Sequence, residues 1–253
     1  MRATIITIGD EILAGKVINW NAYWIAKRLT SMGIEVVRIF CVPDNIDAIG
    51  EALGSSISME VDYIITTGGL GPTPGDITLE AISRALGIRL VLNEKALSFV
   101  KRRYSELKAA GLVDEDYIDD YRRKMALVPE GSDVLYNEVG VAPGVIIRYG
   151  KTTIFVLPGV PSEAMYLFEK IVPMLSRGAL QISEEVIEVR DESMVAPILD
   201  KIRKMFPGVS IKTYPLGFGQ KFMRVIAVGT DMESLHEALN TLRRELSKGS
   251  PPR

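Results

Sequence analysis

One strand, loop and helix pattern constrains this chain more than any other feature. Residues 63–67 form an apolar, β-branched run, residues 68–76 are rich in glycine and proline, and residues 77–85 carry apolar side chains at helical spacing. Such a loop offers backbone N–H groups and the positive end of a helix dipole, and both bind phosphate. We therefore predict a phosphate-binding loop, although its spacing matches neither a P-loop nor a dinucleotide-binding fingerprint.

Asp76, at the end of this loop, has two interpretations. Its carboxylate can cap the following helix by accepting a hydrogen bond from a backbone N–H two or three residues later, which is worth about 1 kcal/mol. It can instead stand beside a bound phosphate, where it would hold a divalent cation or orient a donor. The sequence leaves both interpretations open, and one carboxylate can serve both.

Composition and charge exclude several classes of protein. The 253 residues include 30 Lys and Arg and 32 Asp and Glu, for a net charge of -2, so we expect no nucleic-acid partner. We find no signal-peptide pattern and no apolar run of membrane-spanning length, and we expect a cytoplasmic protein without a membrane partner. With one histidine and one cysteine, any chemistry falls to carboxylates, hydroxyls and backbone amides.

Apolar strands alternate with helices over residues 1–178, which we predict to form an α/β domain. The pattern predicts a mostly parallel sheet covered by helices on both faces, in three layers. Ligands of such sheets bind at the C-terminal ends of the strands, so the loops after Ile8, Thr67 and Leu157 should share one edge. The predicted strands are 3–8, 34–40, 61–67, 88–92, 144–149 and 152–157, and the predicted helices are 21–32, 45–58, 77–86, 93–110, 116–126 and 161–175.

The pattern changes near residue 183. Strands at 185–189, 209–214 and 222–229, with helices at 193–205 and 233–247, predict a small β-α-β-β-α domain over residues 179–248. The loop at 215–221 would connect its last two strands, and residues 249–253 would form a tail.

Four motifs occur in order along the chain: Gly9–Gly15 followed by Asn21, then Thr66–Thr78, Asn137–Gly144 and Leu157–Glu163. This set resembles the molybdopterin-binding MoaB/Mog-type family and, within it, the N-terminal part of CinA, the competence/damage-inducible protein. The resemblance covers about residues 3–175, and the small domain is similar to the accessory domain that follows in CinA. The amidohydrolase domain that comes next in CinA has no counterpart in these residues.

The resemblance implies roles for individual residues. Asp76, Asp10 and Glu11 match the family's acidic residues and are the candidates for catalysis, with Asp76 and Asp10 as ligands of a divalent metal, which we expect to be Mg²⁺. Capping or turn roles remain open for Asn21, Asn137 and Ser162. The candidates for binding the ligand and its phosphates are Thr67, Gly68, Gly69, Gly71, Thr73, Asn137, Gly144, Pro158, Gly159, Ser162 and Glu163.

The resemblance also implies activities, each on a small-molecule nucleotide or pterin phosphate. CinA-type domains are associated with metal-dependent cleavage of pyrophosphates such as ADP-ribose or FAD, and Mog-type relatives adenylate molybdopterin from ATP. A third hypothesis is a non-catalytic binding module, because Gly75 and Asn19 stand where CinA-type domains usually have aspartates. We expect a homo-oligomer, either a dimer as in CinA or a trimer as in Mog-type proteins.

Overall fold

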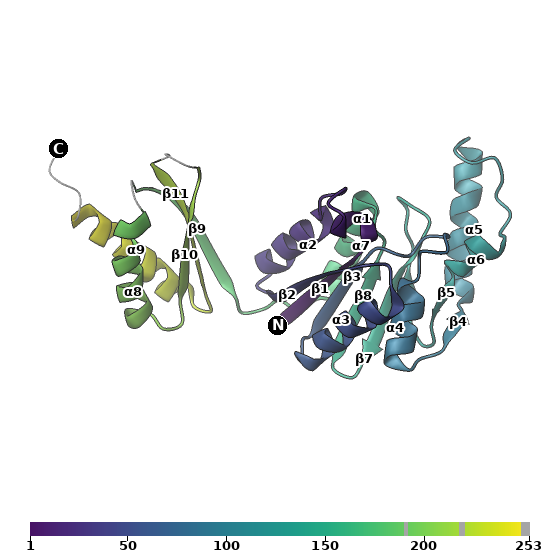
Figure 1. Cartoon of the computed structure of the whole chain (residues 1–253), viewed down its shortest axis with the longest axis horizontal. Coiled ribbons are helices and arrows are strands. Elements are labelled where there is room, and N and C mark those ends of the chain that lie inside the picture. The colour runs from purple at the N-terminus through teal and green to yellow at the C-terminus, as the bar shows by residue number, and fades with distance from the viewer. Residues whose placement is uncertain (190–191, 218–220, 249–253) are drawn as a thin grey trace. The chain divides into compact units, whose positions relative to one another are not determined.

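The computed structural model describes residues 1–189, 192–217 and 221–248 (Figure 1). The chain divides into two compact units, the first made of residues 1–30 and 35–177 and the second of residues 31–34 and 178–253. The expected tail at 249–253 and the middle of the expected loop at 215–221 lie outside the described residues. Among the described helices, none combines the length and the hydropathy needed to cross a membrane.

The first unit is built on a six-stranded sheet in the order β2-β1-β3-β8-β7-β6. The neighbours from β2 to β8 pair in parallel, whereas β7 and β6 are antiparallel additions at one side. This is the mostly parallel sheet that the sequence predicts. The strands are β1 (Arg2–Ile8), β2 (Glu35–Val42), β3 (Tyr63–Thr67), β6 (Asp133–Leu135), β7 (Gly144–Tyr149) and β8 (Thr152–Leu157).

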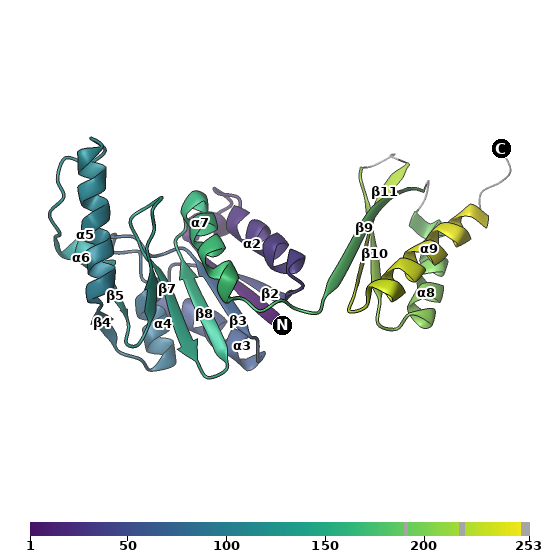
Figure 2. The same ribbon diagram turned by 180° about the vertical axis from the view of Figure 1, so that it is seen from behind.

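Helices cover both faces of this sheet and complete the predicted three layers. Figures 1 and 2 show α2 (Trp20–Ser31) and α7 (Pro161–Ile171) on one face, and α3 (Ile46–Ser58) and α4 (Thr78–Leu86) on the other. Side chains alternate between the faces, so Ile6 and Ile64 join the core that includes residues of α3 and α4, while Ile5 and Ile65 point the other way. All four isoleucines are fully buried, which explains why these strands read as continuous apolar runs.

Three predicted elements of the first unit need correction. The strand expected at 88–92 is only β4 (Leu90–Leu92), and it pairs with β5 (Leu127–Pro129) outside the main sheet. The helix expected at 116–126 is reduced to α6 (Asp120–Lys124), because Asp119 caps it by accepting from Arg122 N–H at 2.7 Å. The helix expected to reach residue 175 ends at Ile171, where a 3₁₀ turn at Val172–Met174 follows, since Pro173 has no N–H to continue the α-helix. The long helix α5 (Glu94–Ala109) lies where it was predicted.

The second unit has the predicted β-α-β-β-α order. Its three strands form an antiparallel sheet in the order β10-β11-β9, and it has its own core around Val225, Leu235 and Leu239. A 3₁₀ turn at Glu192–Met194 precedes its first helix. The elements are β9 (Gln181–Glu188), α8 (Ala196–Met205), β10 (Ser210–Pro215), β11 (Phe222–Gly229) and α9 (Met232–Lys248).

The three loops that carry the sequence motifs lie side by side. Strands β1, β3 and β8 are direct neighbours, and Thr7 pairs with Thr67, which in turn pairs with Leu157. The loops after these strands therefore leave from one edge of the sheet, as predicted.

Candidate functional site

A cavity of about 530 Å³ opens at this edge of the sheet. It is lined by residues that follow β1, including Glu11 and Ile12 of α1 (Asp10–Leu13), by the loop between β3 and α4, and by the residues around the start of α7. Nine of the predicted site residues line it: Glu11, Thr67, Gly68, Gly69, Gly71, Asp76, Pro158, Gly159 and Glu163.

The glycines of the central loop are required by close backbone packing. Gly68 and Gly69 have φ angles of 107° and 65°, which side chains rarely allow. A Cβ on Gly68 would lie 2.1 Å from the carbonyl oxygen of Ile8, and one on Gly69 would lie 2.2 Å from Thr78 Oγ1. Thr78 fixes the loop to α4, because its hydroxyl donates to the Gly68 carbonyl at 2.8 Å and its N–H donates to the Gly69 carbonyl at 3.2 Å.

Three consecutive backbone N–H groups of this loop have no acceptor in the described part of the chain. They belong to Gly69, Leu70 and Gly71, all of which line the cavity. Unpaired N–H groups at a cavity wall are donors for an anion such as phosphate. The three N–H groups are therefore candidate donors to a phosphate, and phosphate binding by this loop stays a prediction.

Asp76 does not cap α4, so the capping interpretation is wrong. The N-cap position of α4 is Ile77, which provides no side-chain cap. The Asp76 carboxylate turns back instead and accepts from Thr73 N–H at 2.9 Å and Thr73 Oγ1 at 2.6 Å. The reason is a tight turn, in which Asp76 N–H donates to the Thr73 carbonyl at 3.1 Å. Gly71 permits this approach, because a Cβ there would lie 2.8 Å from Asp76 Oδ2.

Asp44, which the sequence analysis did not select, also lines the cavity. Its Oδ2 accepts from Asp10 N–H at 3.2 Å, and its own N–H donates to Asp10 Oδ1 at 3.3 Å. Burial raises the pKa of Asp44, the hydrogen bond from Asp10 lowers it, and the charges of Asp10, Glu11 and Asp76 raise it further. Asp44 could have been selected from the sequence because it lies just after β2, at the sheet edge that was predicted to hold the site.

Asn137 organises the loop before β7 rather than lining the cavity. Its Nδ2 donates to the carbonyl of Ala142 at 3.0 Å and to Glu163 Oε2 at 2.6 Å, while its Oδ1 accepts from the N–H groups of Val139 and Gly140. This network holds Ala142 at the cavity wall. Asn137 itself is buried, so it affects the shape of the cavity indirectly, through the loop that it holds.

Glu163 is the cavity carboxylate that this network holds. Burial raises its pKa, while the hydrogen bond from Asn137 and the charge of Arg103 lower it. A Cβ on Gly140 would overlap the carboxylate, at 1.8 Å from its Oε2, so the glycine allows the loop to pass over Glu163.

Asn21 has a different role from the expected cap. Asn19 is the residue that caps α2, because its Oδ1 accepts from Ala22 N–H at 3.2 Å. Asn21 instead donates from Nδ2 to the Gly159 carbonyl at 2.7 Å and lines the cavity. Its Oδ1 and the Thr67 hydroxyl are both buried at the cavity without a hydrogen-bond partner among the described residues.

Five predicted site residues do not line the cavity: Asp10, Thr73, Asn137, Gly144 and Ser162. Asp10 and Thr73 act through Asp44 and Asp76, which they contact. Gly144 is buried at the start of β7, where a Cβ would lie 3.3 Å from Leu167 Cδ1, so its role is packing against α7. Ser162 is exposed in the first turn of α7.

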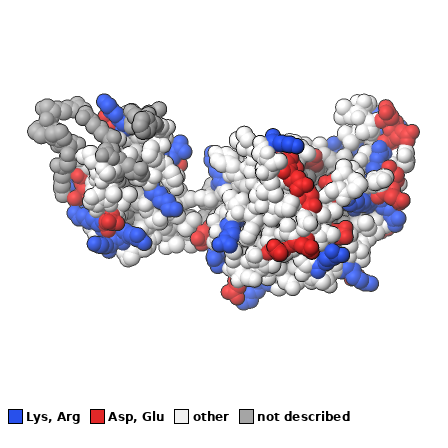
Figure 3. All heavy atoms as spheres, viewed as in Figure 1, with Lys and Arg blue, Asp and Glu red and all other residues white. Residues whose placement is uncertain are grey.

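The cavity is acidic. Four of its lining residues are carboxylates, namely Glu11, Asp44, Asp76 and Glu163, and the described lining includes no lysine or arginine. On the face drawn in Figure 3, basic side chains of the first unit are interspersed with acidic ones. Within the described residues, no three His, Cys, Asp or Glu side chains converge closely enough to hold a metal ion. Mg²⁺ is commonly held by one or two carboxylates together with the phosphates of a ligand, and the cavity fits a cation that is bound in this shared way.

The fold and the site define a three-layer α/β domain with a cavity at the C-terminal edge of its sheet. Residues 4–177 match the family model of the probable molybdopterin binding domain, and the chain belongs to this family. The predicted resemblance is thus confirmed.

Relatives extend the match over nearly the whole chain. Protein PF0476 of Pyrococcus furiosus is 41% identical over 250 residues, which cover 98% of this chain and 97% of the relative. Protein TK1472 of Thermococcus kodakarensis is 38% identical over 243 residues, which cover 96% of each chain. Among solved structures, CinA of Thermoplasma acidophilum, described as having unknown function, is 35% identical with a TM-score of 0.63, and the match covers 69% of this chain and 98% of CinA.

Proposed function

We propose that the chain binds a nucleotide with a pyrophosphate group, of the ADP-ribose or FAD type, and hydrolyses that group with a divalent metal, Mg²⁺ by preference. One observation carries the proposal: three free backbone N–H groups and four carboxylates meet at a cavity whose described lining has no basic side chain. Carboxylates repel a phosphate unless a cation lies between them. A site of this composition therefore suits a phosphate ligand that is bound together with a metal ion.

Different groups of the chain bind different parts of the ligand. The N–H groups of Gly69, Leu70 and Gly71 receive phosphate oxygens, and the carboxylates of Asp44 and Asp76 hold the cation, with Asp10 and Glu11 adding negative charge next to them. The Thr67 hydroxyl is left to donate a hydrogen bond to a phosphate or hydroxyl oxygen of the ligand, and Asn21 Oδ1 is left to accept one from a ligand hydroxyl. When bound, the cation supplies neutralisation of the charge on the phosphates, which is a large part of phosphoryl-transfer catalysis.

The reaction is a hydrolysis at one phosphorus atom. A water oxygen forms a bond to that phosphorus, and the bond from it to the bridging oxygen breaks. The bridging oxygen leaves on the second phosphate, and the two protons of the water pass to the two phosphate products, from which they ionise into solvent. ADP-ribose would yield AMP and ribose 5-phosphate. Positioning and charge neutralisation are the contributions expected of the protein.

Incubation of the protein with ADP-ribose or FAD and Mg²⁺, Mn²⁺ or Co²⁺, followed by chromatography, tests the proposal. We expect AMP to form only with metal, and Asp76→Ala to abolish its formation because this variant removes a cation ligand. The exposed acidic residue Asp114 lies outside the cavity lining, so Asp114→Ala should match the unaltered protein. If the protein binds the nucleotide but forms no AMP with any of the three metals, hydrolysis is contradicted and the chain is a binding module. The lack of three converging metal ligands among the described residues would explain that result.

The family description, a probable molybdopterin binding domain, supports a second candidate, the binding of a pterin phosphate, and the resemblance to Mog-type proteins implies its adenylation. Adenylation would join AMP from ATP to the terminal phosphate of the pterin and release pyrophosphate. This candidate predicts ATP consumption that depends on the pterin, whereas the proposed hydrolase needs only the dinucleotide, the metal and water. A coupled assay for pyrophosphate release distinguishes the two.

We also propose that the chain forms a homo-oligomer, either a dimer or a trimer. Five large apolar side chains between residues 13 and 23 are exposed, which is a feature of interaction surfaces. We call this group the apolar segment; it consists of Leu13, Val17, Ile18, Trp20 and Tyr23.

A further inference from the structure

Lys124 makes the contact that ties the Thr73–Asp76 turn to another part of the fold. Its ammonium group donates a hydrogen bond to the carbonyl oxygen of Thr73, which lies 51 residues earlier in the chain. Residues 73–75 are exposed. Among the described residues, no other hydrogen bond joins the turn to an element outside the loop between β3 and α4. The position of this exposed turn therefore depends on Lys124.

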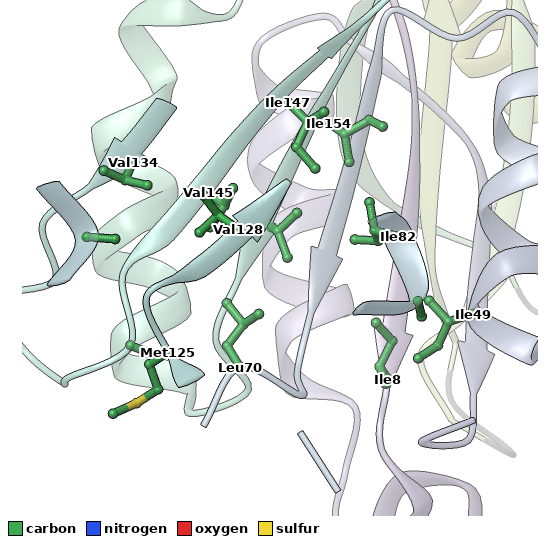
Figure 4. Close-up of a cluster of buried hydrophobic side chains, with 14 of the residues drawn as sticks. Ile8, Ile49, Leu70, Ile82, Met125, Val128, Val134, Val145, Ile147 and Ile154 are labelled. Carbon is green, nitrogen blue, oxygen red and sulfur yellow. The ribbon is translucent and has the colours of Figure 1, made fainter. Parts of the chain in front are cut away.

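The backbone on which Lys124 stands is well packed. Lys124 is the last residue of α6, and the two residues after it, Met125 and Ala126, are 3% and 0% exposed. Met125 belongs to the same core cluster as Leu70 of the loop, and Figure 4 shows the two side chains near each other. The Ala126 carbonyl also accepts from Asn93 N–H at 2.9 Å. Lys124 therefore contacts the turn from a fixed part of the fold.

The turn in its own right orients the Asp76 carboxylate. Thr73 N–H and Thr73 Oγ1 both donate to Asp76 Oδ2, at 2.9 Å and 2.6 Å. The Thr73 carbonyl that Lys124 holds also accepts from Asp76 N–H, at 3.1 Å. Asp76 Oδ1 has no donor in the described part of the chain, so it is the oxygen left for a cation. Any displacement of Thr73 would displace this oxygen as well.

We propose that Lys124 is a positioning residue for the cation site, because it holds Thr73 in place and thereby orients Asp76 Oδ1. The inference rests on the proposed function, since it requires Asp76 to be a ligand of the metal ion. Lys124 and Asp76 both line a smaller cavity of about 260 Å³ beside the loop, so the ammonium group lies near the carboxylate. As a cation itself, the ammonium repels a metal ion, and its contribution is the position of Asp76.

Amide hydrogen exchange of the full chain, followed by NMR, tests the contact without any ligand. In Lys124→Met we expect the amides of Thr73 and Asp76 to exchange about tenfold faster, as for the loss of one hydrogen bond from a charged group. A charge effect alone would have the opposite sign, because removing a nearby positive charge slows exchange that is catalysed by hydroxide. Lys124→Arg keeps a charged donor and should keep the slow exchange.

Calorimetric titration with ADP in saturating Mn²⁺ measures the effect on the site. We expect Lys124→Met to weaken ADP binding about tenfold, because a displaced Asp76 carboxylate no longer holds the cation on the phosphates. In Asp76→Asn protein the same substitution should change the affinity by no more than about twofold, since the carboxylate through which Lys124 acts is gone. Lys101→Met removes an exposed lysine of α5 that lines neither cavity, and it should change neither the exchange nor the affinity.

The possible failures are distinguishable. If Lys124→Met leaves the exchange of Thr73 and Asp76 unchanged, Lys124 does not hold the turn and the inference is wrong. If exchange is faster but ADP binds as before, Lys124 stabilises the turn without serving the site, and the inference is also wrong. Equal losses of affinity with and without the Asp76 carboxylate would mean that Lys124 contacts the phosphates directly. If the unaltered protein binds no ADP in Mn²⁺, the proposed function fails, and the inference fails with it.

Discussion

The conformation of the central loop depends on the absence of a Cβ atom at one glycine. The Asp76 carboxylate folds back onto Thr73, and this is possible only because Gly71 has no Cβ to meet it at 2.8 Å. The neighbouring Gly75 has no such restriction, since a Cβ there would meet only Thr73 Oγ1 at 3.8 Å. The two glycines therefore form a matched pair in one loop.

The two glycines lead to a prediction about adding one methyl group at each position. Gly71→Ala should displace the Asp76 carboxylate and lower metal-dependent turnover, or nucleotide affinity in the absence of turnover, by about a hundredfold, as displacements near 1 Å do. Gly75→Ala should leave both unchanged, because its Cβ has ordinary space. Steady-state kinetics and calorimetry of the two variants provide the measurement, and equal losses in both would contradict this account of the loop.

The roles of several individual residues could not be predicted from the sequence. The loop glycines and Asp76 stood out because Gly and Pro cluster there, but Asp44 is a single acidic residue after a strand and forms no pattern of its own. Asn19 and Asn21 are two possible caps within three positions, and only the hydrogen bonds to Ala22 and Gly159 separate their roles. Sequence spacing does not contain that information.

At the scale of elements, the long and strongly patterned segments were predicted and the short ones were not. Strands β1, β3 and β8 are buried apolar runs, and α5 is a long helix capped by Asn93, whose side chain accepts from Ala96 N–H. Strands β5 and β6 have three residues each, too few to display a period of two, and tertiary pairing with β4 and β7 determines them.

The contact between α7 and the loop before β7 leads to a prediction about pH. Burial raises the pKa of Glu163 in the folded protein, so the folded state keeps this proton at pH values where the unfolded chain has released it. The ionised carboxylate therefore lowers stability above the raised pKa. Glu163→Gln should increase the free energy of unfolding at pH 8, and the gain should shrink as pH falls through the raised pKa.

Urea denaturation across the pH range provides the measurement, with Glu106→Gln as a control of opposite sign. Hydrogen bonds from Arg103 and Arg102 lower the pKa of Glu106 to about 2. Its contribution to stability is present above its unfolded-state pKa and is lost as pH falls toward 2, so Glu106→Gln should destabilise the protein at pH 8. If Glu163→Gln has a lower free energy of unfolding than the unaltered chain at every pH, burial of the ionised Glu163 carboxylate does not lower stability and the prediction is wrong.

At the scale of the whole molecule, the proposed oligomer needs a surface. The apolar segment is the candidate: Ile18 is 85% exposed, and the rings of Trp20 and Tyr23 lie 5.3 Å apart. Its neighbours Ile12 and Asn21 line the first cavity, so a subunit bound here would lie next to the site.

This surface leads to a prediction about mass in solution. Ile18→Asp should lower the molar mass measured by light scattering toward the 27.9 kDa of one chain, because a carboxylate would have to be buried without a partner. Leu112 is also largely exposed, at 71%, but lies outside the apolar segment, so Leu112→Asp should leave the mass unchanged. If the unaltered protein is already a monomer, or if both variants dissociate equally, another surface or no surface mediates assembly.

The contacts of the glycine loop also limit how a protein of this design can diversify. At Gly68 a new side chain would lie 2.1 Å from the backbone oxygen of Ile8, so no change of a neighbouring side chain could make room, whereas at Gly159 a Cβ would make only a tight contact of 3.3 Å with Gly68 Cα. Substitution of Gly68 is therefore excluded unless the backbone of the loop or of the end of β1 moves. New ligand preferences would have to arise at other lining positions of the cavity, such as the exposed Val160, rather than at Gly68.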